Sequence, residues 1–253
     1  MENQQIANQL DQAALKAIAT NQISEINNID LASAYNIQKL SIANRINRGE
    51  KLVGLKMGFT SKAKMEQMGV HDLIWGRLTD GMQYKIGDSL NLDQFIHPRA
   101  EPEIAFLISK DINEEVTLDN VKDFVGGVAV ALEIIDSRFA NFKFSLEDVV
   151  ADNCSSAAFV IGDMKPADTN INGILMSMVG DDVIVGKGNS DAILGNPWES
   201  LVAAARLSKA NGEPIKKDHL VLAGAATSAV FLKKGQTVSA HAEGLGSVFL
   251  DIV

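Results

Sequence analysis

Cysteine is almost absent from the sequence. Cys154 is the single cysteine among 253 residues, so the chain cannot form an internal disulfide, and this composition fits a reducing compartment. No apolar run reaches the length of a membrane span. Residues 1–5 have neither the basic nor the apolar region of a secretory signal peptide. We therefore expect a cytoplasmic protein.

Positive charge is also in short supply. Lysine and arginine together number 23, against 32 aspartates and glutamates, which gives a formal net charge of -9. This balance argues against binding to nucleic acid, or to an anionic membrane, through a general electrostatic field. A small anionic substrate is compatible with it, but local cations or a bound metal ion would have to hold that substrate.

What is present is an ordinary globular composition, 46% hydrophobic and 22% charged, in a chain long enough for one large domain with a small appendage. Residues 5–20 place apolar side chains at helical spacing. A second helix is expected from Asp30, a favourable N-cap, to Gly49, a favourable C′ residue. We interpret residues 1–50 as an N-terminal helical segment that packs on the main body or on a neighbouring subunit. Residues 51–253 would then form the main domain.

The second half of the chain is dominated by expected strands and hairpins. Asn196 and Pro197 open one helix there, with the cap and the N1 proline in the preferred order. Helices in the first half and strands in the second indicate an α+β fold with a mixed, curled sheet. The strands are expected at residues 174–179, 183–185, 220–223, 237–242 and 247–253.

Two carboxylates stand one residue apart at the start of another expected strand, just before the apolar run at residues 104–108. Side chains alternate along a strand, so Glu101 and Glu103 point to the same face. Pro102 points to the other face, and its missing N–H fits a strand end or an edge. Neighbouring carboxylates repel each other unless water or a cation screens them. A solvated strand edge is the alternative to a cation site.

A third carboxylate, Glu133, is the only charge in the strand-like run at residues 128–135. A lone glutamate in so apolar a run is costly to bury without a partner. Together with Glu101 and Glu103 it would supply three oxygen ligands on two rigid strands. Such a set suits a hard divalent cation, Mg²⁺ or Mn²⁺, with coordination positions left for a ligand.

Lys56 lies in an expected strand, residues 53–59, whose odd positions are apolar. The even positions read Gly54, Lys56 and Gly58, so the lysine is flanked by glycines on its own face. Glycine weakens a strand interior and often marks the close approach of a ligand. The alternative is an exposed lysine on a weak edge strand.

The segment after Glu133 carries two cations and several phenylalanines. Arg138 and Lys143 could line a pocket for an anion. Equally, the phenylalanines could be core residues and Arg138 could pair with Asp136. Further along, residues 152–156 form a polar cluster in which Cys154 is expected to be a small buried residue rather than a nucleophile.

Two loops complete the candidate site. Residues 224–228 form a small-residue loop whose amides and hydroxyls could bind a carboxylate. In the first half, Thr60 or Ser61 caps a short helix expected at residues 62–68. His71 follows in a loop, where a solvated residue is the simpler interpretation than a ligand.

Five ordered motifs together resemble the hydratase/decarboxylase branch of the fumarylacetoacetate hydrolase superfamily, and the match covers nearly the whole chain. The resemblance implies an α+β fold built as a mixed β-sandwich roll with N-terminal helices. It also implies an oligomeric assembly and activity on small 2-oxo acids, the substrates of this family. Association with a sister enzyme of the same pathway is a further expectation for its partners. The motifs are GLKMGFTS at residues 54–61, PRAEPEIA at 98–105, LEIIDSR at 132–138, VADNCS at 150–155 and EGLGSV at 243–248.

The same resemblance implies roles for particular residues. It implies Mg²⁺ or Mn²⁺ on Glu101, Glu103 and Glu133, and a catalytic Lys56. It also implies that residues 51–253 form the catalytic domain. Substrate contacts are expected from Ser155 and Thr227, with Arg138 and Lys143 as further candidates from the cationic segment.

The choice of reaction rests on departures from the hydratase pattern. Hydratases of this branch carry a Pro-Asp-Phe/Tyr-Gly block, whereas the matching run here is Leu-Ile-Trp-Gly at residues 73–76, with an apolar residue where the aspartate would stand. Residues 135–144 are similar to those of the decarboxylases. We therefore expect decarboxylation of 2-oxo-3-hexenedioate (4-oxalocrotonate) in the catabolism of aromatic compounds. Hydration of 2-hydroxypenta-2,4-dienoate (2-keto-4-pentenoate) is the alternative.

Two further possibilities remain at this point. The missing aspartate also fits a metal-binding subunit without activity of its own, which would stabilise a sister enzyme. Hydrolysis of acylpyruvates occurs elsewhere in the superfamily. Those hydrolases usually have aspartate as the third metal ligand, so Glu133 argues against this reaction.

Overall fold

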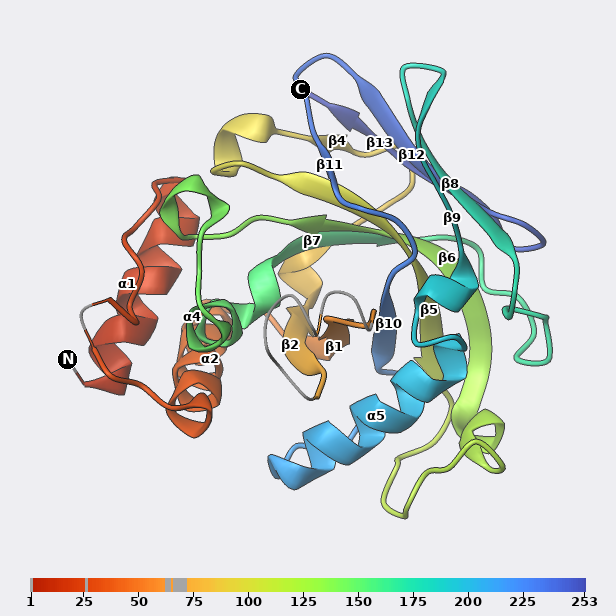
Figure 1. Ribbon diagram of the computed structural model, residues 1–253, viewed down its shortest axis with the longest axis horizontal. Coiled ribbons are helices and arrows are strands. Elements are labelled where there is room, and N and C mark those ends of the chain that lie inside the picture. Colours follow the sequence, from red (N-terminus) through yellow and green to blue (C-terminus); the bar gives the residue numbers. More distant parts are fainter. Residues whose placement is uncertain (1, 26, 62–64, 66–71) are drawn as a thin grey trace.

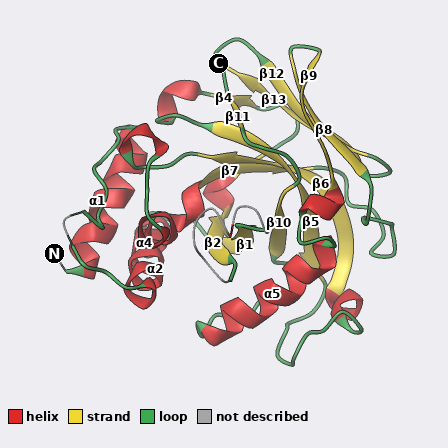
Figure 2. Ribbon diagram, viewed as in Figure 1, coloured by secondary structure: helices red, strands yellow, loops and turns green. Residues whose placement is uncertain are grey.

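Two β-sheets and a set of helices make up the computed structural model, which describes residues 2–25, 27–61, 65 and 72–253 (Figures 1 and 2). The fold is α+β with mixed sheets, as the sequence predicts. None of the helices in the described ranges is both long and apolar enough to cross a membrane. The helix expected at residues 62–68 and His71 fall on the parts of the chain outside these ranges, so both stay predictions.

The helices begin where the sequence predicts. The Asp30 side chain accepts a hydrogen bond from the Ser33 amide, and Asn196 caps the helix that Pro197 opens. The first helix is shorter than expected, because Ala17 adopts a left-handed conformation and the chain turns so that Thr20 can pair with the Arg138 carbonyl. The α-helices are α1 (Asn3–Lys16), α2 (Leu31–Asn47), α4 (Leu146–Ala151) and α5 (Pro197–Ala210).

The larger sheet has the strand order β2-β1-β10-β5-β6-β7-β3, with β11 pairing to the start of β5. The pairs β1–β10 and β3–β7 are parallel and the others are antiparallel, so the sheet is mixed. Its strands are β1 (Leu52–Gly58), β2 (Ile74–Thr79), β3 (Gln83–Tyr84), β5 (Arg99–Ile108), β6 (Val125–Ile135), β7 (Ser156–Ile161), β10 (Leu220–Ala225) and β11 (Val230–Phe231).

The smaller sheet contains both predicted hairpins, β8–β9 and β12–β13, and has the order β4-β13-β12-β8-β9. Apolar side chains of β12 and β13 pack on β5 and β6 of the larger sheet and form one buried core with them. The two longest strands of the larger sheet are thereby held rigidly from one side. The strands of the smaller sheet are β4 (Ser89–Leu90), β8 (Leu175–Gly180), β9 (Val183–Asn189), β12 (Thr237–Ala242) and β13 (Gly246–Ile252).

The N-terminal helices pack on the main body, as expected. Ile6 and Leu10 of α1, Ile37 of α2, Phe139 and Val150 belong to a second buried cluster, separate from the core between the sheets. In Figure 1 the helices α1, α2 and α4 lie to the left of β1 and β2, the two strands at one edge of the larger sheet. The predicted boundary between residues 1–50 and 51–253 stays a prediction.

Pro102 corrects one expectation. The sequence places it at a strand end or an edge, whereas it lies inside β5, between β6 and the β10/β11 side of the sheet. Its carbonyl accepts from the Ala226 amide at 2.9 Å, in the gap where β10 has ended and β11 has not yet begun. A missing N–H is tolerated in a central strand here because the neighbouring strand is itself interrupted.

Candidate metal centre and active-site pocket

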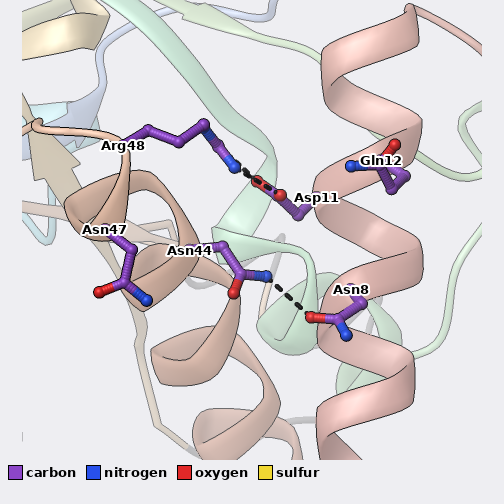
Figure 3. Close-up of a pocket in the computed structure, with 6 residues that line it drawn as sticks. All are labelled: Asn8, Asp11, Gln12, Asn44, Asn47 and Arg48. Atoms are coloured by element: carbon purple, nitrogen blue, oxygen red, sulfur yellow. Dashed lines mark hydrogen bonds and ion pairs between the residues drawn. The ribbon is translucent and has the colours of Figure 1, made fainter.

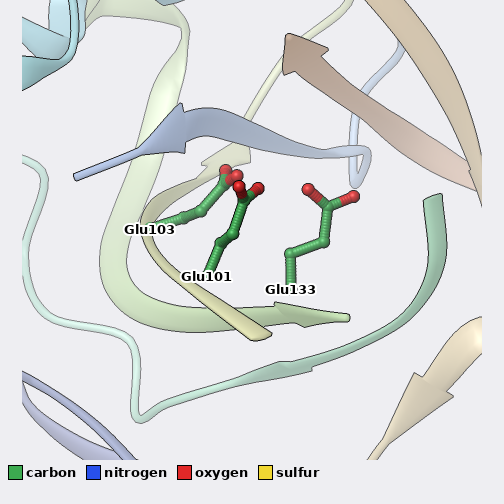
Figure 4. A group of neighbouring side chains, drawn as sticks. All are labelled: Glu101, Glu103 and Glu133. Carbon is green, nitrogen blue, oxygen red and sulfur yellow. The ribbon is translucent and has the colours of Figure 1, made fainter. Parts of the chain in front are cut away.

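Three glutamates meet on one face of the larger sheet (Figure 4). Antiparallel pairing places Glu101 of β5 directly opposite Glu133 of β6, and Glu103 follows on the same face of β5. One carboxylate oxygen from each residue lies within 4.8 Å of the others. Glu103 and Glu133 are fully buried and Glu101 is half-buried. The sequence prediction that these three side chains converge is confirmed.

The residues present fit a hard divalent cation. One oxygen of Glu103 accepts from the Gly224 amide at 2.7 Å, but its other oxygen, which is also buried, has no hydrogen-bond partner among the described residues. Glu133 is fully buried as well, and its partner there is the Lys56 ammonium, 2.8 Å from one of its oxygens. Burial, and then the Glu133 charge, raises the pKa of Glu103 well above its ordinary range. Buried carboxylates left this way call for a cation, and all three supply the oxygen ligands that Mg²⁺ and Mn²⁺ prefer.

The Gly224 amide is a contribution that the sequence prediction assigned elsewhere. The loop at residues 224–228 was expected to offer its amides to a bound carboxylate, whereas the first of them orients Glu103. Gly224 has a φ of +110°, and a Cβ there would lie 2.1 Å from the Thr60 hydroxyl oxygen. Only glycine therefore lets this loop approach the metal centre.

Lys56 reaches the same centre from β1. Its Nζ lies 2.8 Å from a Glu133 oxygen and 3.3 Å from the Cys154 carbonyl oxygen, and only 4% of the residue is exposed. Burial acts to lower the pKa of Lys56, but the carboxylates of Glu133, Glu103 and Glu101 outweigh it, so the pKa is raised. The lysine is cationic at neutral pH.

Two interpretations of the β1 sequence need correction. β1 is an interior strand between β2 and β10, so the alternative of an exposed edge lysine is wrong. Gly54 makes room for the neighbouring strand rather than for a ligand, whereas Gly58 packs against Ile74 and also lines the pocket. A Cβ at Gly54 would lie 1.9 Å from the Leu220 carbonyl oxygen, and one at Gly58 would lie 2.9 Å from the Ile74 side chain.

Ser155 enters the pocket from an unusual turn. Asn153, Cys154 and Ser155 have φ values of 51°, 52° and 59°, three left-handed residues in succession. The Ser155 hydroxyl is buried and has no hydrogen-bond partner among the described residues. A buried hydroxyl without a partner, at the wall of a pocket, is available to a bound ligand.

Asn153 holds that turn in place, and sequence reasoning missed it. The Arg77 amide donates to its Oδ1 at 2.7 Å, and its Nδ2 donates to the Arg77 carbonyl at 2.9 Å, so the side chain pairs with β2 as a strand would. The available signal was an asparagine in a polar cluster, because asparagine tolerates left-handed φ better than most residues.

The pocket in front of the metal centre has a volume of about 700 Å³. Of the predicted substrate contacts, Ser155, Thr227 and Lys143 line it together with Lys56. Sequence reasoning missed Arg99, which also lines it. The signal was its position two residues before Glu101, on the same face of β5. Glu101 lines the pocket as well, and the remaining lining combines hydroxyl residues with apolar and small ones: Thr60, Ser61, Met57, Gly58, Phe59, Ile74, Ile135, Phe142, Phe144, Val149, Cys154, Ala192 and the rest of residues 225–229.

Arg138 is a correction, because the structure does not place it in the pocket lining. Its guanidinium is buried against Asp152, pairing with both the carboxylate and the main-chain carbonyl, and its amide donates to Asp152 at 2.9 Å. The alternative pairing with Asp136 is also wrong. Asp136 instead accepts from the amides of Ile96 and His97 at 2.8 Å.

Cys154 is buried, as expected. Burial, and then the carboxylates of Glu133 and Asp152, raises the pKa of its thiol to about 12, despite the opposing effect of Lys56. The thiol is therefore protonated at neutral pH and unsuited to nucleophilic catalysis.

The chain is similar to several known proteins. Residues 85–253 match the model of the fumarylacetoacetate hydrolase C-terminal domain. A 4-oxalocrotonate decarboxylase of a Pseudomonas species is 48% identical over 248 residues, 98% of this chain and 97% of the relative. A 2-keto-4-pentenoate hydratase of Paraburkholderia phymatum is 36% identical over 225 residues, 87% of this chain and 85% of the relative. The structure of 4-oxalocrotonate decarboxylase from Pseudomonas putida G7, complexed with magnesium and adipate, has a TM-score of 0.95 and 32% identity, covering 99% of this chain and 97% of that one.

Proposed function

The chain belongs to the fumarylacetoacetate hydrolase family, and from that premise we propose that it is a divalent-metal-dependent lyase that decarboxylates 2-oxo-3-hexenedioate. One observation carries the proposal: three carboxylates, two of them fully buried, converge opposite a buried lysine at the wall of a large pocket. The similarity to named decarboxylases over nearly the whole chain supports it.

Glu101, Glu103 and Glu133 would hold Mg²⁺ or Mn²⁺. When bound, such an ion supplies Lewis-acid polarisation of a 2-oxo acid and stabilises negative charge that develops on it. The Gly224 amide keeps Glu103 oriented for this purpose, and Lys56 neutralises part of the charge on Glu133.

Lys56 has the position and the charge of a proton donor or a carboxylate anchor. Its ammonium is held by the Glu133 carboxylate and the Cys154 carbonyl, which fixes Nζ in the pocket wall. We expect the hydroxyls of Ser155 and Thr227 to bind substrate oxygens, and the Lys143 ammonium adds positive charge among the same lining residues.

Hydration of 2-hydroxypenta-2,4-dienoate is the second candidate, favoured by the relatives named as hydratases. Against it, the position that carries an aspartate in hydratases is occupied by the apolar side chain of Ile74, which is buried in the pocket wall. Asp72 does not replace it, because its carboxylate is exposed and forms two hydrogen bonds with Arg206 of α5 at 3.0 and 2.7 Å.

Substrate turnover tests the proposal directly. Purified protein with Mg²⁺ is incubated with 2-oxo-3-hexenedioate, with 2-hydroxypenta-2,4-dienoate and with acetylpyruvate. Release of CO₂ from the first is expected. Formation of a hydroxy-oxo acid from the second, or of acetate from the third, without CO₂ release would replace decarboxylation by hydration or hydrolysis.

The assembly is part of the same proposal. We expect a homo-oligomer, which sedimentation analysis measures, and association with a sister enzyme of the pathway is possible. Absence of turnover on all three substrates, combined with stable co-purification of another chain, would indicate a metal-binding subunit without activity of its own.

A further inference from the structure

We infer that Arg99 determines substrate specificity, because its guanidinium binds the distal carboxylate of a 2-oxo dicarboxylic acid. The inference deepens the proposed function and rests on it for the orientation of the substrate, whose 2-oxo end faces the three glutamates. It concerns a side chain at the other end of the same pocket.

The first argument is position along β5. Arg99, Glu101 and Glu103 are alternate residues of one strand, so they share a face of the sheet. Glu101 and Arg99 are separated by two strand residues, which is about 6.6 to 6.8 Å. A six-carbon chain spans five carbon–carbon bonds of about 1.5 Å each in a zigzag, which is a similar reach. A substrate fixed at the glutamates would place its far end near Arg99.

The second argument is that Arg99, unlike the other arginines, forms no ion pair within the described parts of the chain, although the charge of Glu101 partly offsets the lowering of its pKa by burial. The sequence has six arginines, and Arg45, Arg48, Arg77, Arg138 and Arg206 each form an ion pair with an aspartate or glutamate. No ion pair joins Arg99 to a carboxylate within the described parts of the chain, and its buried Nε has no hydrogen-bond partner there. A guanidinium that is half-buried in a pocket wall without an anion is poised to receive one from a ligand.

The third argument is how Arg99 is held. Its guanidinium carbon lies 4.0 Å from the ring centre of Phe142 and 4.2 Å from that of Phe231. Phe231 is directly opposite Arg99 in the pairing of β11 with β5. Contacts with ring faces leave the in-plane N–H groups of a guanidinium free, and these are the donors that bind a carboxylate in a bidentate manner. The side chain is thus oriented before a ligand arrives.

Binding of matched ligands to the Mg²⁺-loaded protein tests the inference by calorimetry. 2-Oxoadipate and 2-oxohexanoate have the same length and differ in the distal carboxylate. The wild type is expected to bind 2-oxoadipate about 10- to 100-fold more tightly. In Arg99→Met that preference should fall to within about two-fold, through loss of 2-oxoadipate affinity alone. Arg99→Lys should retain part of the preference, because lysine keeps the positive charge but cannot bind a carboxylate through two parallel N–H groups.

A matched control comes from the far end of the same strand. Lys110 follows β5, and its ammonium lies over the ring of Phe124 at 4.3 Å, outside the pocket lining. Lys110→Met removes one positive charge and one cation–π contact, as Arg99→Met does, and should leave both affinities unchanged. Mg²⁺ affinity, measured in the same instrument, should be equal in all variants.

The inference is overturned if wild-type protein shows no preference for 2-oxoadipate, or if Arg99→Met weakens both ligands equally. If Arg99→Met does not fold, an undiminished preference in Arg99→Lys overturns it, and a reduced one supports it. Failure of the proposed function looks different. Wild-type protein would release no CO₂ from 2-oxo-3-hexenedioate while still preferring the dicarboxylate in an Arg99-dependent way.

Discussion

Two clusters of polar side chains in this molecule differ in how completely they satisfy one another. In the groove between α1 and α2, of about 390 Å³, Arg48 donates two hydrogen bonds of 2.7 Å to the carboxylate of Asp11, and Asn44 donates to Asn8 at 3.0 Å (Figure 3). On the sheet, the carboxylates of Glu101, Glu103 and Glu133 instead face one another (Figure 4).

The difference separates a structural cluster from a binding one. A polar group whose partners are all within the protein stabilises the fold and has little left to offer a ligand. Buried carboxylates that repel one another cost folding free energy, and a bound cation would return it. The helical groove therefore holds two helices together, whereas the three carboxylates of the sheet cluster carry more negative charge than the one ammonium of Lys56 beside them neutralises, which suits a bound cation.

The largest expected effect is on activity. Glu103→Gln or Glu133→Gln removes one anionic ligand, and we expect turnover of 2-oxo-3-hexenedioate to fall by at least about 1,000-fold, because a metal ion supplies several kcal/mol of transition-state stabilisation. Steady-state kinetics at saturating Mg²⁺ measures this. Arg48→Ala in the helical groove serves as the control and should stay within about two-fold of wild type. An equal loss of turnover in Arg48→Ala would contradict the view that only the glutamate cluster binds a catalytic metal ion.

Alkylation of Cys154 tests the place where the two regions meet, since the residue packs with the helical layer while its carbonyl accepts from Lys56. A thiol with its pKa raised to about 12 by burial has little thiolate at pH 8. We expect iodoacetamide to label the folded, metal-free protein at least about 100-fold more slowly than the urea-unfolded chain. Rapid labelling of the folded protein would contradict the packing of this boundary.

The free energy of unfolding of the metal-free protein should depend on pH through the glutamate cluster. The pKa of Glu103 is raised in the folded state, so the folded protein binds a proton more tightly than the unfolded chain, and metal-free stability should fall as pH rises above the ordinary value of 4.5. Urea unfolding in EDTA should show this fall reduced in Glu103→Gln, which we expect to be more stable than wild type at pH 8 by about 1 to 3 kcal/mol. A steeper fall of stability with pH in Glu103→Gln would contradict a raised pKa of Glu103 in the folded protein.

An effect confined to stability is expected in the helical groove itself. Arg48→Ala leaves the carboxylate of Asp11, which is only 6% exposed, without its partner. The free energy of unfolding should drop by about 1 to 3 kcal/mol. Urea denaturation measures the loss, and Mg²⁺ affinity measured beside it should be unchanged. A weakened Mg²⁺ affinity would show that the helices contribute to the metal centre more directly than their contacts indicate.

The sequence was sufficient to predict features that depend on neighbouring residues, such as the alternation of side chains along a strand and the caps of helices. Alternation along one strand placed Glu101 and Glu103 on a common face, and a lone charge in an apolar run identified Glu133. Caps at Asp30 and Asn196 fixed where helices begin.

It was insufficient where a partner comes from a distant strand or loop. Nothing near Arg138 in the sequence distinguishes Asp152 from Asp136 as its partner. The interruption of β10 that accommodates Pro102 is set more than 100 residues away, as is the backbone of Leu220 that requires Gly54. Alternation along β5 could have indicated Arg99, but that it forms no ion pair within the described residues is apparent only in three dimensions.

The double hydrogen bond of Asn153 to β2 makes the helical layer a remote support for the lysine. Gln38, fully buried on α2, accepts from the Arg77 guanidinium and donates to the Val150 carbonyl at 2.7 Å. The main-chain amide of Arg77 donates to the Asn153 side chain, and the carbonyl of the following residue, Cys154, accepts from the Lys56 ammonium. The N-terminal segment, none of whose described residues line the pocket, thus supports the position of the Lys56 ammonium. Gln38→Leu should lower kcat without altering Mg²⁺ affinity, and an unchanged kcat would show that the lysine needs no such support.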